Sequence, residues 1–147
     1  MAAIVGRKGS AQVFVHSGSG EIALADKIGK LTTFGVPTAE PTEIDVTDFD
    51  SDGKEYEYGT IDYGELTVTQ HLTSDEYNTM QGYIDNDTAV KVAFFILNKA
   101  DTQVVGRQGD AKVKSCTIEG VEVDGAMTVN TTFKITGATS AATLPVA

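Results

Sequence analysis

The chain has 147 residues, a formal net charge of −10 and a sequence pI near 4.4. The acidic balance argues against a general nucleic-acid binder, which would carry a basic face, and the length predicts one domain over residues 1–147. A single cysteine excludes an internal disulfide, and the lack of eighteen consecutive apolar residues predicts no membrane span.

The first third of the chain predicts short strands. Residues 1–10, which include Arg7 and Lys8, are interpreted as a mobile N-terminal arm. Alternating side chains predict a strand over 11–16, a second strand around Ile22 and Leu24, and a third within 28–36.

The region from residue 43 to residue 70 carries most of the charge. Ile44 and Val46 alternate with polar residues, as do Leu66 and Val68, which predicts a half-buried strand on each side of a loop over 48–63. Residues 40–65 hold ten acidic residues against one basic residue. The loop also carries apolar and aromatic side chains, so we interpret it as a docking loop that orders against a partner; a solvated acidic loop is the alternative. Its proposed contact residues are Asp48, Phe49, Asp50, Asp52, Glu55, Tyr56, Glu57, Tyr58, Ile61 and Tyr63.

One short helix is predicted at about residues 74–85. Thr73 and Glu76 have the spacing of a capping box, and Tyr77, Met80 and Ile84 share one face. After it, residues 89–97 are apolar on both faces, which predicts a doubly buried strand. We expect the helix to cover its second face, with a subunit contact as the alternative.

The last third predicts more strands and no further helix. Strands are expected at 104–105, at 111–123 with a bulge near Ser115, and at 127–135 after an Asp-Gly turn at 124–125. Residues 137–147 are interpreted as a flexible C-terminal arm. The pattern predicts a mainly β fold: an antiparallel β-sandwich or barrel with one flanking helix.

Candidate chemical sites are weak. Asp48, Asp50, Asp52 and Gly53 match the first half of a calcium loop, but Gly59 stands where the bidentate carboxylate belongs. Cys116 is predicted to be a small core residue, and His16 and His71 have no cysteine or histidine cluster around them. We therefore expect no cofactor, no metal site and no enzymatic activity.

The motif order resembles a known family. The stretch "AEPTEIDVTDFDSDGKEYEYGTIDYGELTVTQH", the helix after it and the closing "MTVNTTFKITG" are similar to tail tube proteins of long-tailed, non-contractile bacteriophages, over roughly residues 20–137. The tube proteins of contractile tails and of type VI secretion are near alternatives. An acidic β-sandwich binding module with a weak calcium loop is an alternative from another class, and a hydrolase with an unrecognised site is a third.

The resemblance implies a structural protein of the virion, assembled in the host cytoplasm. It implies hexameric rings that stack into a tube around a tape-measure protein, with a tail terminator as a further partner and DNA passing through without specific binding. The long loop and the arms would contact neighbouring subunits. Within such a tube, we expect the basic counterparts of the loop acids among Arg7, Lys8, Lys112 and Lys114, and lumen-facing acids at Glu65 and Glu119, which fall on the polar sides of predicted strands.

Overall fold

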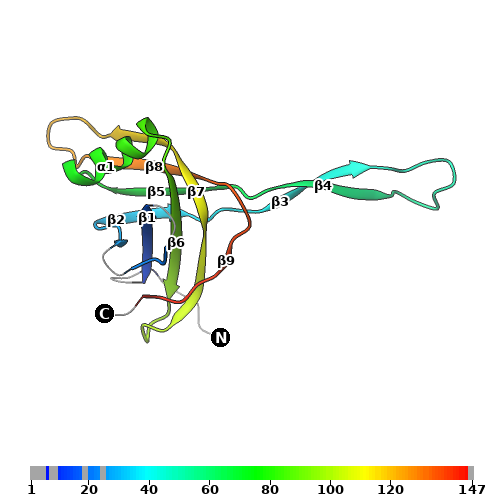
Figure 1. Cartoon of the computed structure of the whole chain (residues 1–147), viewed down its shortest axis with the longest axis horizontal. Coiled ribbons are helices and arrows are strands. Elements are labelled where there is room, and N and C mark those ends of the chain that lie inside the picture. The colour runs from blue at the N-terminus through cyan, green and yellow to red at the C-terminus, as the bar shows by residue number, and fades with distance from the viewer. Residues whose placement is uncertain (1–5, 7–9, 18–19, 24–25, 146–147) are drawn as a thin grey trace.

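The computed structural model describes residues 6, 10–17, 20–23 and 26–145. The fold is mainly β, with antiparallel strands and one helix, as predicted (Figure 1). Its elements are β1 (Ala11–Ser17), β2 (Leu31–Gly35), β3 (Glu40–Asp45), β4 (Tyr56–Asp62), β5 (Glu65–His71), α1 (Ser74–Asp85), β6 (Ala89–Leu97), β7 (Gln103–Glu119), β8 (Thr128–Ile135) and β9 (Ser140–Ala141). In the part of the chain that is described, no helix is long and apolar enough to cross a membrane.

Most strands belong to one sheet that curls over itself. Its order is β1-β6-β7-β8-β5-β2, with β9 added to β7, and every pairing is antiparallel. Phe34 of β2 and Phe94 of β6 have ring centroids only 5.9 Å apart, although three strands separate β2 from β6 in the sheet order. The curl therefore brings one margin of the sheet over the other, as in an open barrel (Figure 1).

The main core fills the inside of the curl. Alternate residues of β5 and β8 are buried, which confirms the period-2 pattern expected for both strands. Met80 of α1 joins this cluster, and Tyr83 and Ile84 lie against it, so the helix covers one side of the inner face. The fully buried side chains of this core include Val13, Leu66, Val68, Val90 and Phe133.

The helix has the predicted bounds, but its N-terminus is held differently. Thr73 occupies the N-cap position without a side-chain cap bond, and its hydroxyl is buried without a recorded partner. Glu76 accepts hydrogen bonds from the backbone N–H of Gly29, at 3.1 Å, and from the buried side-chain amide of Gln70. The predicted capping box is therefore wrong. Glu76 ties the helix to β5 and to the chain before β2 instead.

Strand β6 is buried on both faces, as predicted, but the helix does not cover both. Ala93 and Phe95 lie on the outer face with Phe14 of β1, whose ring meets that of Phe95 edge to face at 5.4 Å. The apolar side chains packed against this second cluster are Ile22, Ala142 and Leu144. The expectation that the helix covers the second face is thus wrong, because segments from both ends of the chain cover it.

The C-terminal segment, expected to be a flexible arm, contacts the body through residue 144. β9 pairs with Arg107 and Gln108, where β7 extends past the end of β8. The side chain of Gln103 donates to the carbonyl oxygen of Ala142, at 2.7 Å, and accepts from the backbone N–H of Leu144, at 2.8 Å. Residues 146 and 147 lie outside the described residues.

Three further predictions about strands have different outcomes in the structure. The two strands expected after residue 103 are one continuous strand, β7, because its first half pairs with β6 and its second half with β8. Ile22 lies in no strand, and Leu24 is outside the described residues. The bulge expected near Ser115 is confirmed by a register shift between Val113 and Ser115.

Candidate assembly interface

The charged region folds as a two-stranded ribbon that projects from the body. β3 and β4 pair only with each other, and all their residues are exposed (Figure 1). Two predictions about this region are wrong. The strand at Ile44 is not half-buried, and the 48–63 segment is not one long loop, since Tyr56–Asp62 is a strand. A ribbon with solvent on both faces needs no hydrophobic alternation, so its sequence did not show the strand.

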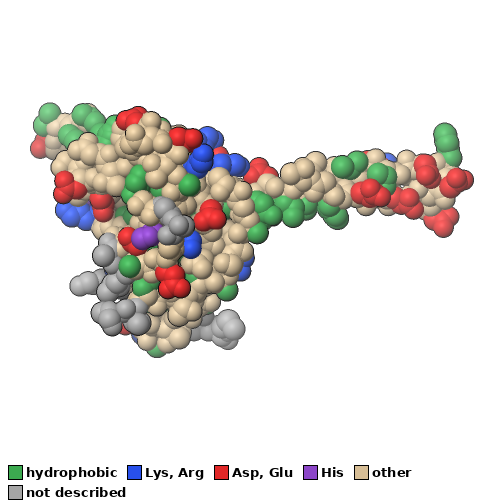
Figure 2. Space-filling model, viewed as in Figure 1, with side chains coloured by type: hydrophobic (Ala, Val, Ile, Leu, Met, Phe, Trp, Pro, Cys, Tyr) green, Lys and Arg blue, Asp and Glu red, His purple; other side chains and the backbone are tan. Residues whose placement is uncertain are grey.

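Strand pairing divides the ribbon into two faces. Residues directly opposite each other in an antiparallel pair point to the same face. Glu43 lies opposite Tyr58, and Asp45 lies opposite Tyr56, so one face combines two aromatic rings with two carboxylates. The other face carries Ile44 opposite Glu57. Tyr58 is 68% exposed. Each face therefore combines apolar and acidic side chains. Figure 2 shows hydrophobic and acidic side chains next to each other along the ribbon.

The tip of the ribbon is a set of local turns around Asp48. Its carboxylate accepts hydrogen bonds from the backbone N–H of Asp50, at 2.9 Å, and from the hydroxyl of Ser51, at 3.1 Å. These bonds form an Asx turn, and both end on Oδ1 of Asp48. Among the described residues, no group of three or more histidine, cysteine or acidic side chains could hold a metal ion. Phe49 stands on this tip with its side chain fully exposed, at 109% of its reference area.

A hydrogen bond from the base of the tip turn also affects Asp45. Its carboxylate accepts from the backbone N–H of Thr47, at 2.9 Å. This bond lowers the pKa of Asp45 below its ordinary value, so its charge persists into acid. Acidic side chains gather along the outer part of the ribbon (Figure 2).

The root of the ribbon is tightly built. Gly64 has a φ of +79°, and a Cβ at this position would lie 2.6 Å from the carbonyl oxygen of Thr38 and 2.8 Å from its nitrogen. The Asp62 carboxylate accepts from the Lys134 ammonium, at 2.8 Å, and from the backbone N–H of Gly64, at 3.0 Å. The lysine contact lowers the pKa of Asp62, with a smaller effect from the Gly64 bond, and the same contact raises the pKa of Lys134. The end of β4 is thereby held to β8, and the chain at Gly64 passes close to the chain at Thr38.

Two of the expected basic counterparts have partners within the same chain. Lys112 pairs with Asp87 at 3.1 Å, and Lys114 pairs with Glu65 at 2.7 Å. Arg7 and Lys8 lie outside the described residues. Lys112 and Lys114 are therefore paired with acids of the body and not with acids of the ribbon.

The two acids expected to face a lumen lie on the outer face of the sheet. Glu65 begins β5 and is paired with Lys114, while Glu119 ends β7 and is exposed. The surface between them is mostly neutral and rich in hydroxyl groups. Its members, identified by strand register, are Thr67, Thr69, Ser115, Thr117, Thr128, Asn130 and Thr132.

The remaining residues considered for catalysis or metal binding are Cys116, His16 and His71. Cys116 is partly buried against the main core, and burial raises the pKa of its thiol, which disfavours the reactive thiolate. His16 bonds to the Asp26 carboxylate at 2.9 Å, and His71 is exposed at the end of β5.

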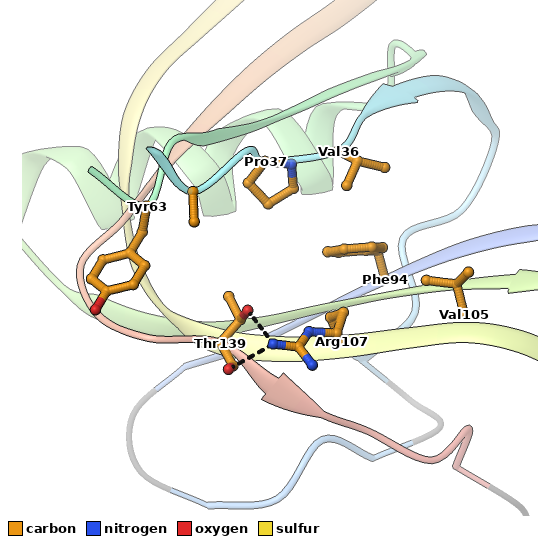
Figure 3. Close-up of a pocket in the computed structure, with 8 residues that line it drawn as sticks. Val36, Pro37, Tyr63, Phe94, Val105, Arg107 and Thr139 are labelled. Carbon is orange, nitrogen blue, oxygen red and sulfur yellow. Dashed lines mark hydrogen bonds between the residues drawn. The ribbon is translucent and has the colours of Figure 1, made fainter. Parts of the chain in front are cut away.

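A pocket at the root of the ribbon, which we call the root pocket, was missed from the sequence. It has a volume of about 150 Å³ and is lined by Val36, Pro37, Ala39, Tyr63, Phe94, Val105, Arg107 and Thr139. Tyr63, Pro37 and Val36 lie on one side, and Arg107 and Thr139 lie opposite (Figure 3). The Arg107 guanidinium donates from Nη2 to the carbonyl and hydroxyl oxygens of Thr139, both at 2.9 Å. The only sequence signal was the apolar pair at 36–37 just before the ribbon.

Comparison with known proteins shows the fold. No family model and no curated protein matches this chain. The chain is similar to a solved structure of the SPP1 tail tube, with 16% identity, a TM-score of 0.67, and coverage of 95% of this chain and 80% of that one. It is similar to a chain in the virion of a native gene transfer agent particle, with 13% identity, a TM-score of 0.67, and coverage of 95% and 100%.

It is also similar to a chain in the anti-feeding prophage baseplate, with 10% identity, a TM-score of 0.68, and coverage of 98% and 99%. The resemblance to tail tube proteins is therefore confirmed at the level of fold.

Proposed function

We propose that this chain is the structural subunit of a tail tube and that it assembles with copies of itself. The observation that carries the proposal is the β3–β4 ribbon. An isolated two-stranded ribbon is marginally stable in water, because neither face has a layer packed on it. Here both faces carry aromatic or aliphatic side chains that no other part of the described chain covers. Contact with another copy would bury these side chains.

The finer form of the proposal follows the resemblance. Six subunits form a ring, rings stack into a tube of the siphophage type, and a tape-measure protein occupies the lumen during assembly. A tail terminator ends the tube. The tube is assembled in the host cytoplasm and becomes part of the virion, and DNA passes through the tube. The role is structural and not enzymatic. The ribbon residues named above would supply the contacts between subunits.

The conduit role bears on the lumen-facing assignment. Lysine and arginine side chains that bind phosphates are the main source of nonspecific DNA affinity. The outer face of β5, β8 and β7 has hydroxyl groups at its centre, and its lysines at positions 112, 114 and 134 are paired with acids. A wall of this kind would hold DNA weakly. Glu65 and Glu119 stay our candidates for lumen-facing acids.

Self-assembly is tested by sizing the purified chain at several concentrations and imaging it by negative-stain electron microscopy. The expected result is concentration-dependent rings or tubes. A strict monomer across the range, without tubes, would contradict the proposal. Stable monomers with a discrete ligand would favour the acidic binding module, and so would a large gain in thermal stability from millimolar calcium that Asp50→Ala abolishes.

A tube of a contractile system is the second candidate. It is supported by the similarity to a chain in the PVC sheath–tube complex of an extracellular contractile injection system, with 14% identity, a TM-score of 0.64, and coverage of 90% of this chain and 88% of that one. The two candidates differ in whether a sheath surrounds the tube. Native particles that carry this chain would show a contractile sheath around the tube only if the second candidate holds.

A further inference from the structure

We infer that the tip of the ribbon of one copy docks in the root pocket of a second copy, with the Phe49 ring as the inserted group. This inference rests on the proposed self-assembly and assigns its contact. The receiving site is the root pocket, and the occupant is a second copy of this chain.

Size and lining favour an aromatic ring as the guest. A cavity of about 150 Å³ lined by aliphatic and aromatic side chains is large enough to take up benzene. The root pocket has about this volume, and seven of its eight lining residues present carbon-rich side chains or a methyl group beside one guanidinium. Val36 is 50% exposed and Val105 is 37% exposed, so solvent reaches the pocket at this end.

The ribbon presents one group that fits. Among the exposed large hydrophobic side chains of the described residues, Phe49 has the highest exposed fraction, 109%, and it stands at the end of the projection. Its own root pocket is out of reach. Residues 39 and 49 are separated by about 33 Å along an extended strand, and β3 runs away from the body (Figure 1). A ring from another copy is therefore the available occupant.

Charge supports this pairing over the neighbouring hollow. Asp48, Asp50 and Asp52 surround Phe49 in sequence. Arg107 lines the root pocket, is exposed, and has no recorded carboxylate partner among the described residues. A second hollow of about 380 Å³ shares Val36 and Val105 with the root pocket, but none of its described lining residues is charged. An acidic tip is thus best matched by the pocket that holds the arginine.

The contact would be heterologous, since tip and root are different surfaces of the same chain. A contact of this kind does not close on a pair of subunits; it leaves one tip and one root free for the next copies. Repeated from copy to copy, such a contact builds a ring where the rotation closes and an open stack where it does not, and a tube uses both.

The first test removes the ring. Phe49→Ala should raise the concentration needed for assembly roughly ten- to a hundred-fold, the factor expected for losing one buried phenylalanine. Its monomer should melt as the wild type does. Val123→Ala is the matched control, because Val123 is also an exposed apolar residue, 89% exposed, in the β7–β8 turn. Ala39→Phe, which fills the pocket from within, should impair assembly as Phe49→Ala does.

The second test asks whether the two sites meet. In a Cys116→Ser background, Phe49→Cys and Ala39→Cys are placed in separate preparations, which are mixed and oxidised. A disulfide between the two preparations is expected, and Val123→Cys mixed with Ala39→Cys should give none. Arg107→Glu should impair assembly, because it places a carboxylate opposite the acidic tip. Adding Asp50→Arg should restore part of the lost assembly.

These outcomes distinguish a failure of the docking assignment from a failure of the tube role. The docking assignment would be overturned, and the tube role left standing, if Phe49→Ala forms tubes at the wild-type concentration. The same holds if tubes form but the mixed Phe49→Cys and Ala39→Cys preparations give no disulfide. Impaired assembly in Ala39→Phe alone would mean that the pocket takes a different occupant. A wild-type chain that stays monomeric, with no disulfide between the mixed preparations, would overturn both.

Discussion

Gly64 is the residue on which the ribbon depends most. Its positive φ disfavours any residue with a Cβ, and the Thr38 backbone occupies the space that a Cβ would need. Gly64→Ala should lower the free energy of unfolding by about 2 kcal/mol or more, measured by urea denaturation. Gly82→Ala in α1 is the control, because nothing lies within 4 Å of its Cβ and alanine favours a helix by roughly 1 kcal/mol. Equal effects of the two substitutions would contradict this account of the root.

The Asp62–Lys134 pair gives the ribbon root a pH dependence. The pKa of Asp62 is lowered in the folded chain, so its stabilising contribution is present above the ordinary aspartate pKa and is lost as pH falls through the lowered value. The pKa of Lys134 is raised, so its contribution is present below the ordinary lysine pKa and is lost as pH rises through the raised value. The pair therefore holds the root best between these limits. Its effect on global stability is small, since both groups are exposed.

A carboxyl titration by NMR tests this pair directly. Lys134→Met should raise the pKa of Asp62 toward its ordinary value, because the main cause of the shift is removed. Asp45 is the internal control, since the Thr47 backbone bond lowers its pKa and lies away from Lys134. An unchanged Asp62 titration in Lys134→Met would show that the ion pair is not formed in solution.

At the scale of elements, the tip of the ribbon can be removed without changing the core. Replacing residues 46–55 by Asn-Gly would join the paired residues Asp45 and Tyr56 through a two-residue hairpin turn. The free energy of unfolding of the monomer should change by no more than about 0.5 kcal/mol, because the removed side chains pack on nothing in the body. Assembly should be lost. Calorimetry and electron microscopy measure the two effects, and unfolding of the shortened chain would contradict the separation of ribbon and body.

Elements that bury one face could be predicted from the sequence, and elements that bury none could not. β8 and β5 alternate because the core takes every second side chain, and α1 shows its buried stripe. The ribbon lacks such a constraint, so its second strand resembled a loop. The cover over Phe14 and Phe95 was also missed, because small, uncharged residues such as Ala142 show no period of their own.

The proposed interface was chosen from the sequence by its charge, but its shape was not predicted. The uneven acidic content singled out the region that forms the projecting ribbon, and most of the aromatic residues proposed there are exposed in the structure. The root pocket needs residues from positions 36 to 139 that only the curled sheet brings together. No local pattern encodes a site of that kind.

At the scale of the whole molecule, net charge opposes association. Copies with a formal charge of −10 repel each other, and the acids are concentrated on the element that we propose makes contact. Exposed charges farther apart than about 10 Å are screened at about 0.1 M salt. Raising the salt from about 0.01 M to about 0.3 M should therefore lower the concentration at which the chain assembles, measured by light scattering. Assembly that weakens steadily with salt would mean that attractive ion pairs outweigh this repulsion.

The length of the ribbon can also determine the spacing between copies in the assembly. Residues 40–50 of one arm extend about 35 Å at the usual rise of a strand. With each tip seated in the root pocket of the next copy, that length would set the interval at which copies repeat. Deleting the paired residues 44–45 and 56–57 keeps the register and the two faces of the ribbon. The repeat of the assembly, measured by electron microscopy, should then shorten by about 7 Å.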